Sequence, residues 1–205
     1  LGVTKASGGR MRAEHIQCVN SDNSTTGWHC HDLDFQFVYV VKGHVAFTAE
    51  GWGDVVLKKG DCAHIPPFTM HDETAFSPDF EVIEITMPAE VTTLTEKPTS
   101  RGTRPDSKMI VDYLDDDSFV RGEGPRSFLE YRDFGFGDAT SGLVQAQVVR
   151  TNGPCDASTG WHYHELDVQF VYVLGGWVET ELEGLGKFHM DPGDAMVVPS
   201  PHKHD

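Results

Sequence analysis

The sequence predicts an all-β fold of two similar barrel or sandwich domains, and three observations lead to this prediction. The chain has 205 residues, which is enough for one large domain or two small ones. It contains 21 glycines and 11 prolines, a turn-rich composition that favours β structure. One long segment also occurs a second time, and a single repeat of this length indicates a duplicated domain.

The repeat pairs residues 27–72 with residues 160–205. The two segments align without a gap and share 21 of 46 positions, including three histidines, one glutamine and five glycines. The first copy continues through residues 73–88 with the apolar pattern of one more strand, for which the second copy has no counterpart. We therefore expect an N-terminal barrel at 1–88, a linker at 89–128 and a C-terminal barrel at 129–205, with the final strand of the second barrel missing from this sequence.

Each copy alternates apolar runs with turns. Residues 35–41 and 168–174 are rich in Val, Phe and Tyr, which favour strands. Glycine-containing turns follow at a spacing typical of a sandwich or barrel. The aromatic residues of these runs lie on the opposite face from the glutamine that each run contains. We expect these aromatics to form the surface on which two barrels, related by pseudo-twofold symmetry, pack together; they are Phe37, Tyr39, Phe170 and Tyr172.

The expected linker differs in composition, because it is polar and contains several prolines and the acidic run of residues 115–117. One short helix is expected at 107–115, where four apolar residues share one face at helical spacing. These residues are Met109, Ile110, Tyr113 and Leu114. We interpret the acidic run as a solvated face of this linker.

Composition excludes several classes of partner. The formal net charge of −16 repels phosphate backbones, so we expect no nucleic-acid partner. No apolar run approaches the roughly 18 residues needed to cross a bilayer. We therefore expect no membrane partner. The four cysteines have no C-x-x-C spacing, which favours reduced, partly buried thiols in a cytoplasmic protein over a disulfide framework; they are Cys18, Cys30, Cys62 and Cys155.

Each copy places four polar side chains at the same spacing: an H-x-H pair, a glutamine five residues later, and a distant histidine. Strand alternation puts both histidines of an H-x-H pair on one face, so two imidazoles can point to one place. Imidazole nitrogens suit Zn, Ni, Cu and Fe, and an amide oxygen can complete the ligand set. The alternative is that these are ordinary polar residues of a strand. Their recurrence in two copies that differ at more than half of their positions favours a metal site.

The pattern G-x-H-x-H-x4-Q followed by G-D-x4-P-x4-H resembles the two sequence motifs of the cupin superfamily. The first motif occupies residues 27–43 and 160–176, and the second occupies 60–71 and 193–204. The resemblance implies two jelly-roll β-barrels in one chain, a bicupin, with a metal ion in the mouth of each barrel. It assigns as metal ligands His29, His31, Gln36 and His71 in the first barrel and His162, His164, Gln169 and His204 in the second.

Both copies depart from the common cupin pattern, which has glutamate where this chain has Gln36 and Gln169. In flavonol-cleaving dioxygenase cupins that glutamate is thought to act also as a base, a role that glutamine cannot take near neutral pH. Asp34 and Asp167 lie two residues before the glutamines and would share their face on a regular strand, which makes them candidate catalytic residues. Alternatively, they support a ligand histidine or bond the amides of a turn, and the turn role is favoured.

Two classes of function fit this ligand set. The first is a metal-dependent enzyme acting on a small organic substrate of carbonyl, enol or aromatic character, such as a dioxygenase or a cyclase/isomerase. Neutral ligands leave the charge of a dication uncompensated, which makes it a strong Lewis acid. The second is a non-enzymatic sensor or storage protein that holds a small ligand or a metal, since one fold hosts many functions. We favour the enzyme, with up to two divalent transition metal ions (Zn, Ni, Fe, Mn or Cu) per chain and a small-molecule ligand; a homo-oligomer is left open.

Overall fold

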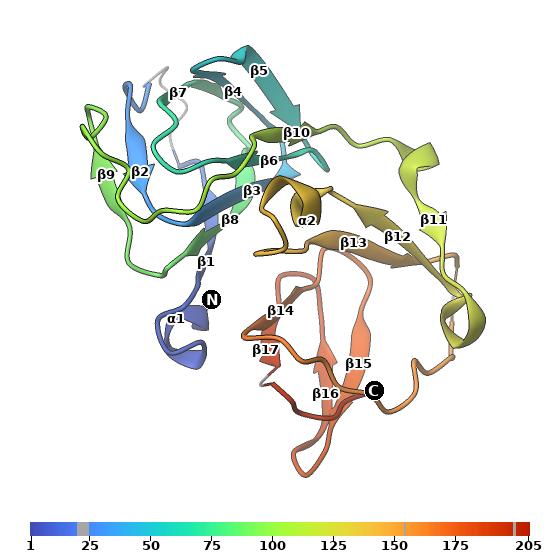
Figure 1. The fold of residues 1–205 in the computed structure, drawn as a ribbon. Helices are drawn as coiled ribbons and strands as arrows, with labels where there is room; N and C mark the ends of the chain where they lie inside the picture. Colours follow the sequence, from blue (N-terminus) through green and yellow to red (C-terminus); the bar gives the residue numbers. More distant parts are fainter. Residues whose placement is uncertain (20–24, 154, 199) are drawn as a thin grey trace.

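The computed structural model describes residues 1–19, 25–153, 155–198 and 200–205, and its regular elements are almost all strands (Figure 1). The first half contains β1 (Arg12–Gln17), β2 (Cys30–Asp32), β3 (Phe35–Lys42), β4 (His44–Ala49), β5 (Gly53–Lys58), β6 (Cys62–Ile65), β7 (His71–Phe76), β8 (Glu81–Met87), β9 (Thr92–Leu94) and β10 (Ile110–Asp112). The second half contains β11 (Val120–Arg121), β12 (Leu129–Asp133), β13 (Gln147–Thr151), β14 (Gln169–Tyr172), β15 (Val178–Leu182), β16 (Gly186–Met190) and β17 (Ala195–Val198). The helices are single turns: α1 (Val3–Ala6), α2 (Phe136–Ala139) and the 3-10 helices η1 (Asp116–Ser118) and η2 (Gly124–Arg126).

The N-terminal barrel has two larger sheets around one apolar core. Their strand orders are β1-β8-β3-β6-β10 and β5-β4-β7, and β2 pairs separately with β9. Strand alternation turns every second side chain inward, so Val40, Val45, Phe47 and Leu57 are each at most 5% exposed. The additional strand predicted after the first copy is β8, which pairs with both β1 and β3 and so lies inside the five-stranded sheet.

The C-terminal half repeats the pairing of the first. Its sheets are β11-β12-β13, β14-β17 and β15-β16. Gln169 on β14 lies opposite Val198 on β17, just as Gln36 on β3 lies opposite Ile65 on β6. The repeat in the sequence is therefore also a repeat in strand register, and the prediction of an all-β duplicated fold is confirmed.

The two halves pack through the aromatic residues expected at their interface. Phe37 lies 5.7 Å from Phe134 and 5.1 Å from Phe136, measured between ring centroids, and Tyr39 packs on the same cluster. On the other side of the interface, Phe170 packs against a cluster formed by α1 and β1. The hydroxyl of Tyr172 lies 3.1 Å from Nδ1 of His15, which belongs to the N-terminal barrel. All four aromatics thus contribute to the contact between barrels.

The prediction of a helix at 107–115 is wrong, because part of this segment forms strand β10. Met109 is buried in the core of the N-terminal barrel, whereas Ile110 packs on the other side, in the interface cluster. Successive residues that face opposite sides require an extended chain. The edge of β6 supplies the backbone partners, with Ile110 opposite His64. In the rest of the expected linker, β9 joins β2, and the helical content is limited to η1 and η2.

The cysteines agree with the expectation of buried thiols rather than disulfides. Cys30 and Cys62 are fully buried and Cys155 is half-buried, and these three carry free thiols. Burial raises the pKa of the Cys62 thiol, and a protonated thiol is a poor nucleophile.

Within the described residues, no helix has both the length and the apolar character required to cross a membrane.

Candidate metal centre

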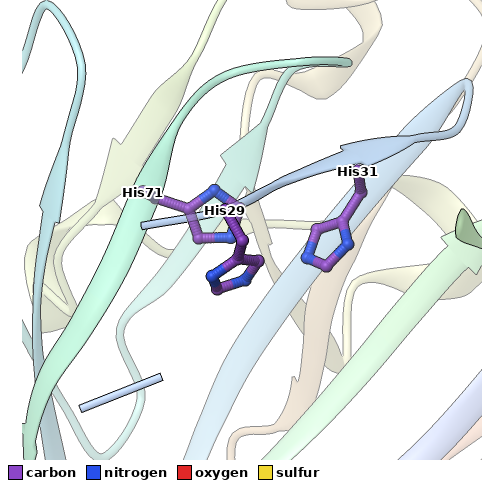
Figure 2. Close-up of side chains that lie close together, drawn as sticks. All are labelled: His29, His31 and His71. Atoms are coloured by element: carbon purple, nitrogen blue, oxygen red, sulfur yellow. The ribbon is translucent and has the colours of Figure 1, made fainter. Parts of the chain in front are cut away.

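Strands β2 and β7 bring three histidines of the N-terminal barrel together. The backbones of His29 and His71 pair as an isolated bridge, with N···O distances of 3.0 and 2.9 Å, which sets the two residues directly opposite each other. His31 follows two residues later on the same face. The ring centroids lie 4.3 Å apart for His29 and His71, 4.9 Å for His29 and His31 and 5.2 Å for His31 and His71. Figure 2 shows the three rings gathered around one point.

The C-terminal barrel repeats this triad closely. His162 and His204 pair through backbone N···O distances of 3.0 and 2.8 Å. The three ring separations, which include His164, are 4.4, 5.0 and 5.3 Å. In each triad one ring nitrogen of every histidine lies within 4.8 Å of the others. The six histidines named from the sequence are therefore assembled as two matching clusters, and their role as ligands stays a prediction.

Backbone carbonyls orient two histidines of each triad. His29 Nδ1 donates to the carbonyl of Gly27 at 2.7 Å, and His71 Nδ1 donates to the carbonyl of Thr69 at 2.9 Å. The equivalent bonds of the second triad measure 2.6 and 3.0 Å. Because a carbonyl only accepts, the proton must sit on Nδ1, and the lone pair of Nε2 is left to face the centre of the triad. This is the arrangement in which imidazole binds a metal.

Two aspartates that the sequence reasoning did not single out as site residues support these carbonyls. Asp72 Oδ1 accepts a hydrogen bond from the Gly27 amide at 2.9 Å, and Asp205 Oδ1 accepts one from the Gly160 amide at 2.9 Å. Each aspartate directly follows the distant histidine of its copy. The repeated His-Asp pair was the feature of the sequence that could have revealed them. By accepting from the glycine amide, each aspartate fixes the turn whose carbonyl orients the first histidine of its triad.

The first triad contains an unsatisfied buried nitrogen next to a carboxylate. His71 Nε2 is buried and has no hydrogen-bond partner. It lies 3.8 Å from one oxygen of Glu73, and His29 Nε2 lies 4.0 Å from the other oxygen. With both Nε2 atoms unprotonated, lone pairs face a carboxylate, an arrangement that repels unless a cation lies among them. The residues present therefore fit a divalent ion, and Glu73 is a further group near it that the sequence motif did not reveal.

Gln36 reaches the same barrel interior from β3 and is 4% exposed. Its Nε2 donates to Glu84 Oε1 at 2.9 Å. Since a carboxylate accepts, this bond fixes the amide with its nitrogen toward Glu84 and leaves Oε1 available as a donor atom for a metal. Gln169 takes the equivalent place at the start of β14 and is half-buried.

Burial shifts the protonation of the site toward neutral forms. Burial, reinforced by the neighbouring His71 and His29, lowers the pKa of His31 to about 4. Burial also lowers the pKa of His71, and it raises the pKa of the Glu84 carboxyl. Neutral imidazoles at ordinary pH keep their lone pairs, which is the state that a metal requires.

We expect the metal-free protein to lose stability as the pH falls from about 6.5 to about 4. His31 has a lower pKa folded than unfolded, so the unfolded chain binds the extra proton in this window and is favoured by acid. Thermal unfolding in chelator across this range measures the effect. His31→Gln should flatten the pH dependence, whereas His44→Gln, at an exposed position of β4, serves as the control. An unchanged slope in His31→Gln contradicts the assignment.

The candidate catalytic aspartates lie in different surroundings from those expected. Asp34 lies in the bend before β3, not on a regular strand. Its Oδ1 accepts from Arg104 Nη1 at 3.0 Å, and Arg104 Nε also donates to Asp32 at 2.6 Å. Asp167 is exposed. The carboxylates close to the ligand side chains are Glu73 and Glu84, so a catalytic role for Asp34 or Asp167 stays an untested prediction.

Comparison with known proteins agrees with this architecture. Residues 15–78 match the family model of the cupin domain (Cupin_2). No protein of curated function matches the sequence. Among solved structures, the salicylate 1,2-dioxygenase of Pseudaminobacter salicylatoxidans aligns with a TM-score of 0.67 at 14% identity, covering 96% of this chain and 67% of that chain. The oxalate decarboxylase of Lactobacillus farciminis, in a formate complex, aligns with a TM-score of 0.69 at 12% identity, covering 97% and 73%.

A third similar structure is the 7S globulin of Momordica charantia, with a TM-score of 0.59 at 15% identity over 95% of this chain and 68% of that chain. At such identities these likenesses show the fold alone. Two conclusions follow: residues 15–78 of the first barrel match a cupin domain, and the chain as a whole has the fold of these cupin-like solved structures.

Proposed function

We propose that this bicupin is a metal-dependent enzyme that acts on a small organic substrate of carbonyl, enol or aromatic character. The observation that carries the proposal is the buried, unpartnered Nε2 of His71, which lies among two further imidazoles and the carboxylate of Glu73. The proposed ligands are the histidine triad and Gln36 in the first barrel, and the equivalent triad and Gln169 in the second. A Zn, Ni, Fe, Mn or Cu ion is compatible with such nitrogen and oxygen donors.

A divalent ion held by three imidazoles and one amide would supply Lewis acidity, which polarises a carbonyl or stabilises an enolate oxygen, and the nearby carboxylate of Glu73 would offset part of its charge. The protein side chains contribute position and exclusion of water. The carbonyls of Gly27 and Thr69 hold the imidazoles in one tautomer, and Glu84 holds the amide of Gln36 in one orientation. Burial of His71 and Gln36 keeps the ligand side of the site dry, which strengthens electrostatic interactions there.

A cavity beside the triad favours an enzyme over a closed structural site. It has a volume of about 130 Å³ and is lined by His31 and Gln36 together with polar residues of β1, β8 and β9. A structural metal site is closed by its ligands, whereas a catalytic one keeps access for a substrate. Elemental analysis of the protein from its native host tests the metal. Loss of turnover on chelation and its return on reconstitution, across a panel of carbonyl, enol and aromatic compounds, test the activity.

Exchanging the side chains of Gln36 and Glu84 tests whether Gln36 is a ligand. Gln36→Glu combined with Glu84→Gln preserves their hydrogen bond but moves the negative charge to the metal side. We expect divalent metal to bind on the order of tenfold more tightly, because ligand charge raises affinity. Turnover should fall, since the added charge weakens the Lewis acid. Competition with a chelator measures the affinity. Glu84→Gln alone is the matched control, and unchanged affinity in the double variant shows that Gln36 is not a ligand.

A further inference from the structure

The cavity beside the first triad has two polar side chains that do not bond the proposed ligands, Arg12 on β1 and Thr86 on β8. Its lining also includes Val91, Glu84, which accepts from Gln36, and Thr93, whose hydroxyl lies 3.1 Å from Nδ1 of His31. Arg12 and Glu84 are its charged residues. The volume of about 130 Å³ is below the roughly 300–1,000 Å³ of pockets that take drug-sized ligands, which favours a small organic occupant.

Strand register places the key side chains in one row. Thr86 on β8 lies opposite Arg12 on β1 and also opposite Gln36 on β3. Residues that are directly opposite in antiparallel strands project to the same face of a sheet. Arg12, Thr86 and Gln36 therefore form a row across three strands, which runs from a guanidinium to the side chain proposed to bind the metal.

Thr86 is the unusual member of this row. It is 2% exposed, and its Oγ1 is buried with no hydrogen-bond partner. A buried hydroxyl requires a hydrogen-bond partner, and no protein group among the described residues supplies one here. Val82, which lies on the same face two positions before Glu84, shows that β8 also accommodates an apolar side chain inward. An unsatisfied donor that lines a cavity points to a ligand that accepts its hydrogen bond.

The chemistry of the lining defines what that ligand carries. Arg12 Nε pairs with Glu14 at 3.4 Å, which leaves the two terminal nitrogens of the guanidinium as paired donors for a carboxylate, and the Thr86 hydroxyl adds another donor. Glu84 uses Oε1 to accept from Gln36, which leaves Oε2 as an acceptor for a ligand hydroxyl. A neighbouring carboxylate and hydroxyl on a two- or three-carbon skeleton satisfy all three groups within the available volume.

We propose that this cavity is a substrate subsite for a small hydroxycarboxylate, bound through Arg12 and Thr86 at its carboxylate and through Glu84 at its hydroxyl. The inference rests on the proposed function and narrows its substrate to a compound whose carbonyl group belongs to a carboxylate. The subsite adjoins the triad through His31, which belongs to both.

The test is calorimetric titration of glycolate into metal-loaded and into metal-free protein. We expect glycolate to bind the wild type, acetate to bind more weakly because it lacks the hydroxyl, and ethylene glycol not to bind. Thr86→Val removes only the hydroxyl and should weaken glycolate roughly ten- to a hundredfold, the value of a hydrogen bond to a charged group. Arg12→Leu should weaken it at least as much. Metal content should stay at the wild-type value in both variants.

Matched variants separate this proposal from a merely structural role. Thr74→Val on the exposed part of β7 and Arg10→Leu before β1 remove the same groups outside the cavity and should leave glycolate affinity unchanged. Thr86→Val should melt at the wild-type temperature or above, because it removes an unsatisfied buried hydroxyl. Wild-type glycolate affinity in Thr86→Val overturns the subsite, as does a wild type that binds glycolate in neither form. If the wild type binds no metal but its glycolate binding still depends on Thr86, the metal centre is overturned and the subsite is not.

Discussion

Replacing His71 with asparagine should remove one of the two proposed metal ions and leave the other in place. His71 supplies the buried, unpartnered Nε2 of the first triad, and the second triad has its own full set of histidines. We expect affinity at the first site to fall by more than about 100-fold, since groups that only orient ligands are already worth 10- to 100-fold. His204→Asn should act in the same way on the second site, and the double variant should bind no metal. Equilibrium dialysis followed by elemental analysis counts the ions.

The two sites act as controls for each other. A variant that has lost one ion and keeps the other is folded, so loss of metal cannot be ascribed to unfolding. Saturating metal should also raise the melting temperature of each single variant less than that of the wild type, because each bound ion contributes about 2.7 kcal/mol at 100 times its Kd. Two ions retained in His71→Asn contradict the site. Fewer than one ion per chain in the saturated wild type contradicts the metal centre as a whole.

Replacing Arg132 with alanine should cost about 3–5 kcal/mol of the free energy of unfolding. Arg132 on β12 is 1% exposed and crosses to the N-terminal barrel. Its guanidinium donates to the carbonyl of Gly60 at 2.8 Å, forms an ion pair with Asp112, and lies 5.2 Å from the ring of Phe134. Truncation leaves the carboxylate of Asp112 and the Gly60 carbonyl without this partner at the contact between barrels. Urea unfolding measures the loss.

Two further variants separate the buried charge from side-chain packing. Arg150→Ala, on neighbouring β13, removes an exposed arginine that also pairs with two carboxylates, and it should stay close to the wild type. Arg132→Met combined with Asp112→Leu removes both partners while keeping volume, so most of the lost stability should return. A double variant as unstable as Arg132→Ala shows that packing against Phe134, and not the ion pair, dominates.

The H-x-H pairs could be predicted because their geometry is local, whereas His71 and His204 were assigned through the resemblance to the cupin motifs. Alternation along a strand puts His29 and His31 on one face whatever surrounds them, and the same spacing recurs at His162 and His164. The same spacing in both copies then supported the assignment of each histidine. Interface aromatics followed from the same alternation, since Phe37 and Tyr39 face away from Gln36 and pack on the opposite barrel.

The polar lining of the cavity could not be predicted in this way, although strand β8, which carries part of it, could. The apolar run that predicts β8 contains Glu84 and Thr86 at alternate positions, and this inward polar pattern was the available signal. Nothing local shows that Arg12 lies opposite Thr86, because the two are far apart in the chain. The surroundings of Asp34 could not be predicted either, because its ion-pair partner Arg104 comes from the segment expected to be a linker.

Local spacing and the repeat predicted the duplicated all-β fold, the two H-x-H pairs and the apolar faces of the strands. Pairing between distant strands set His71 opposite His29, made residues 110–112 a strand on the edge of β6, brought Glu84 to Gln36 and left the hydroxyl of Thr86 without a protein partner. Such pairing satisfies backbone groups and sets the register between segments that are far apart in the chain. Side-chain periodicity within a segment carries no information about which strand will lie beside it.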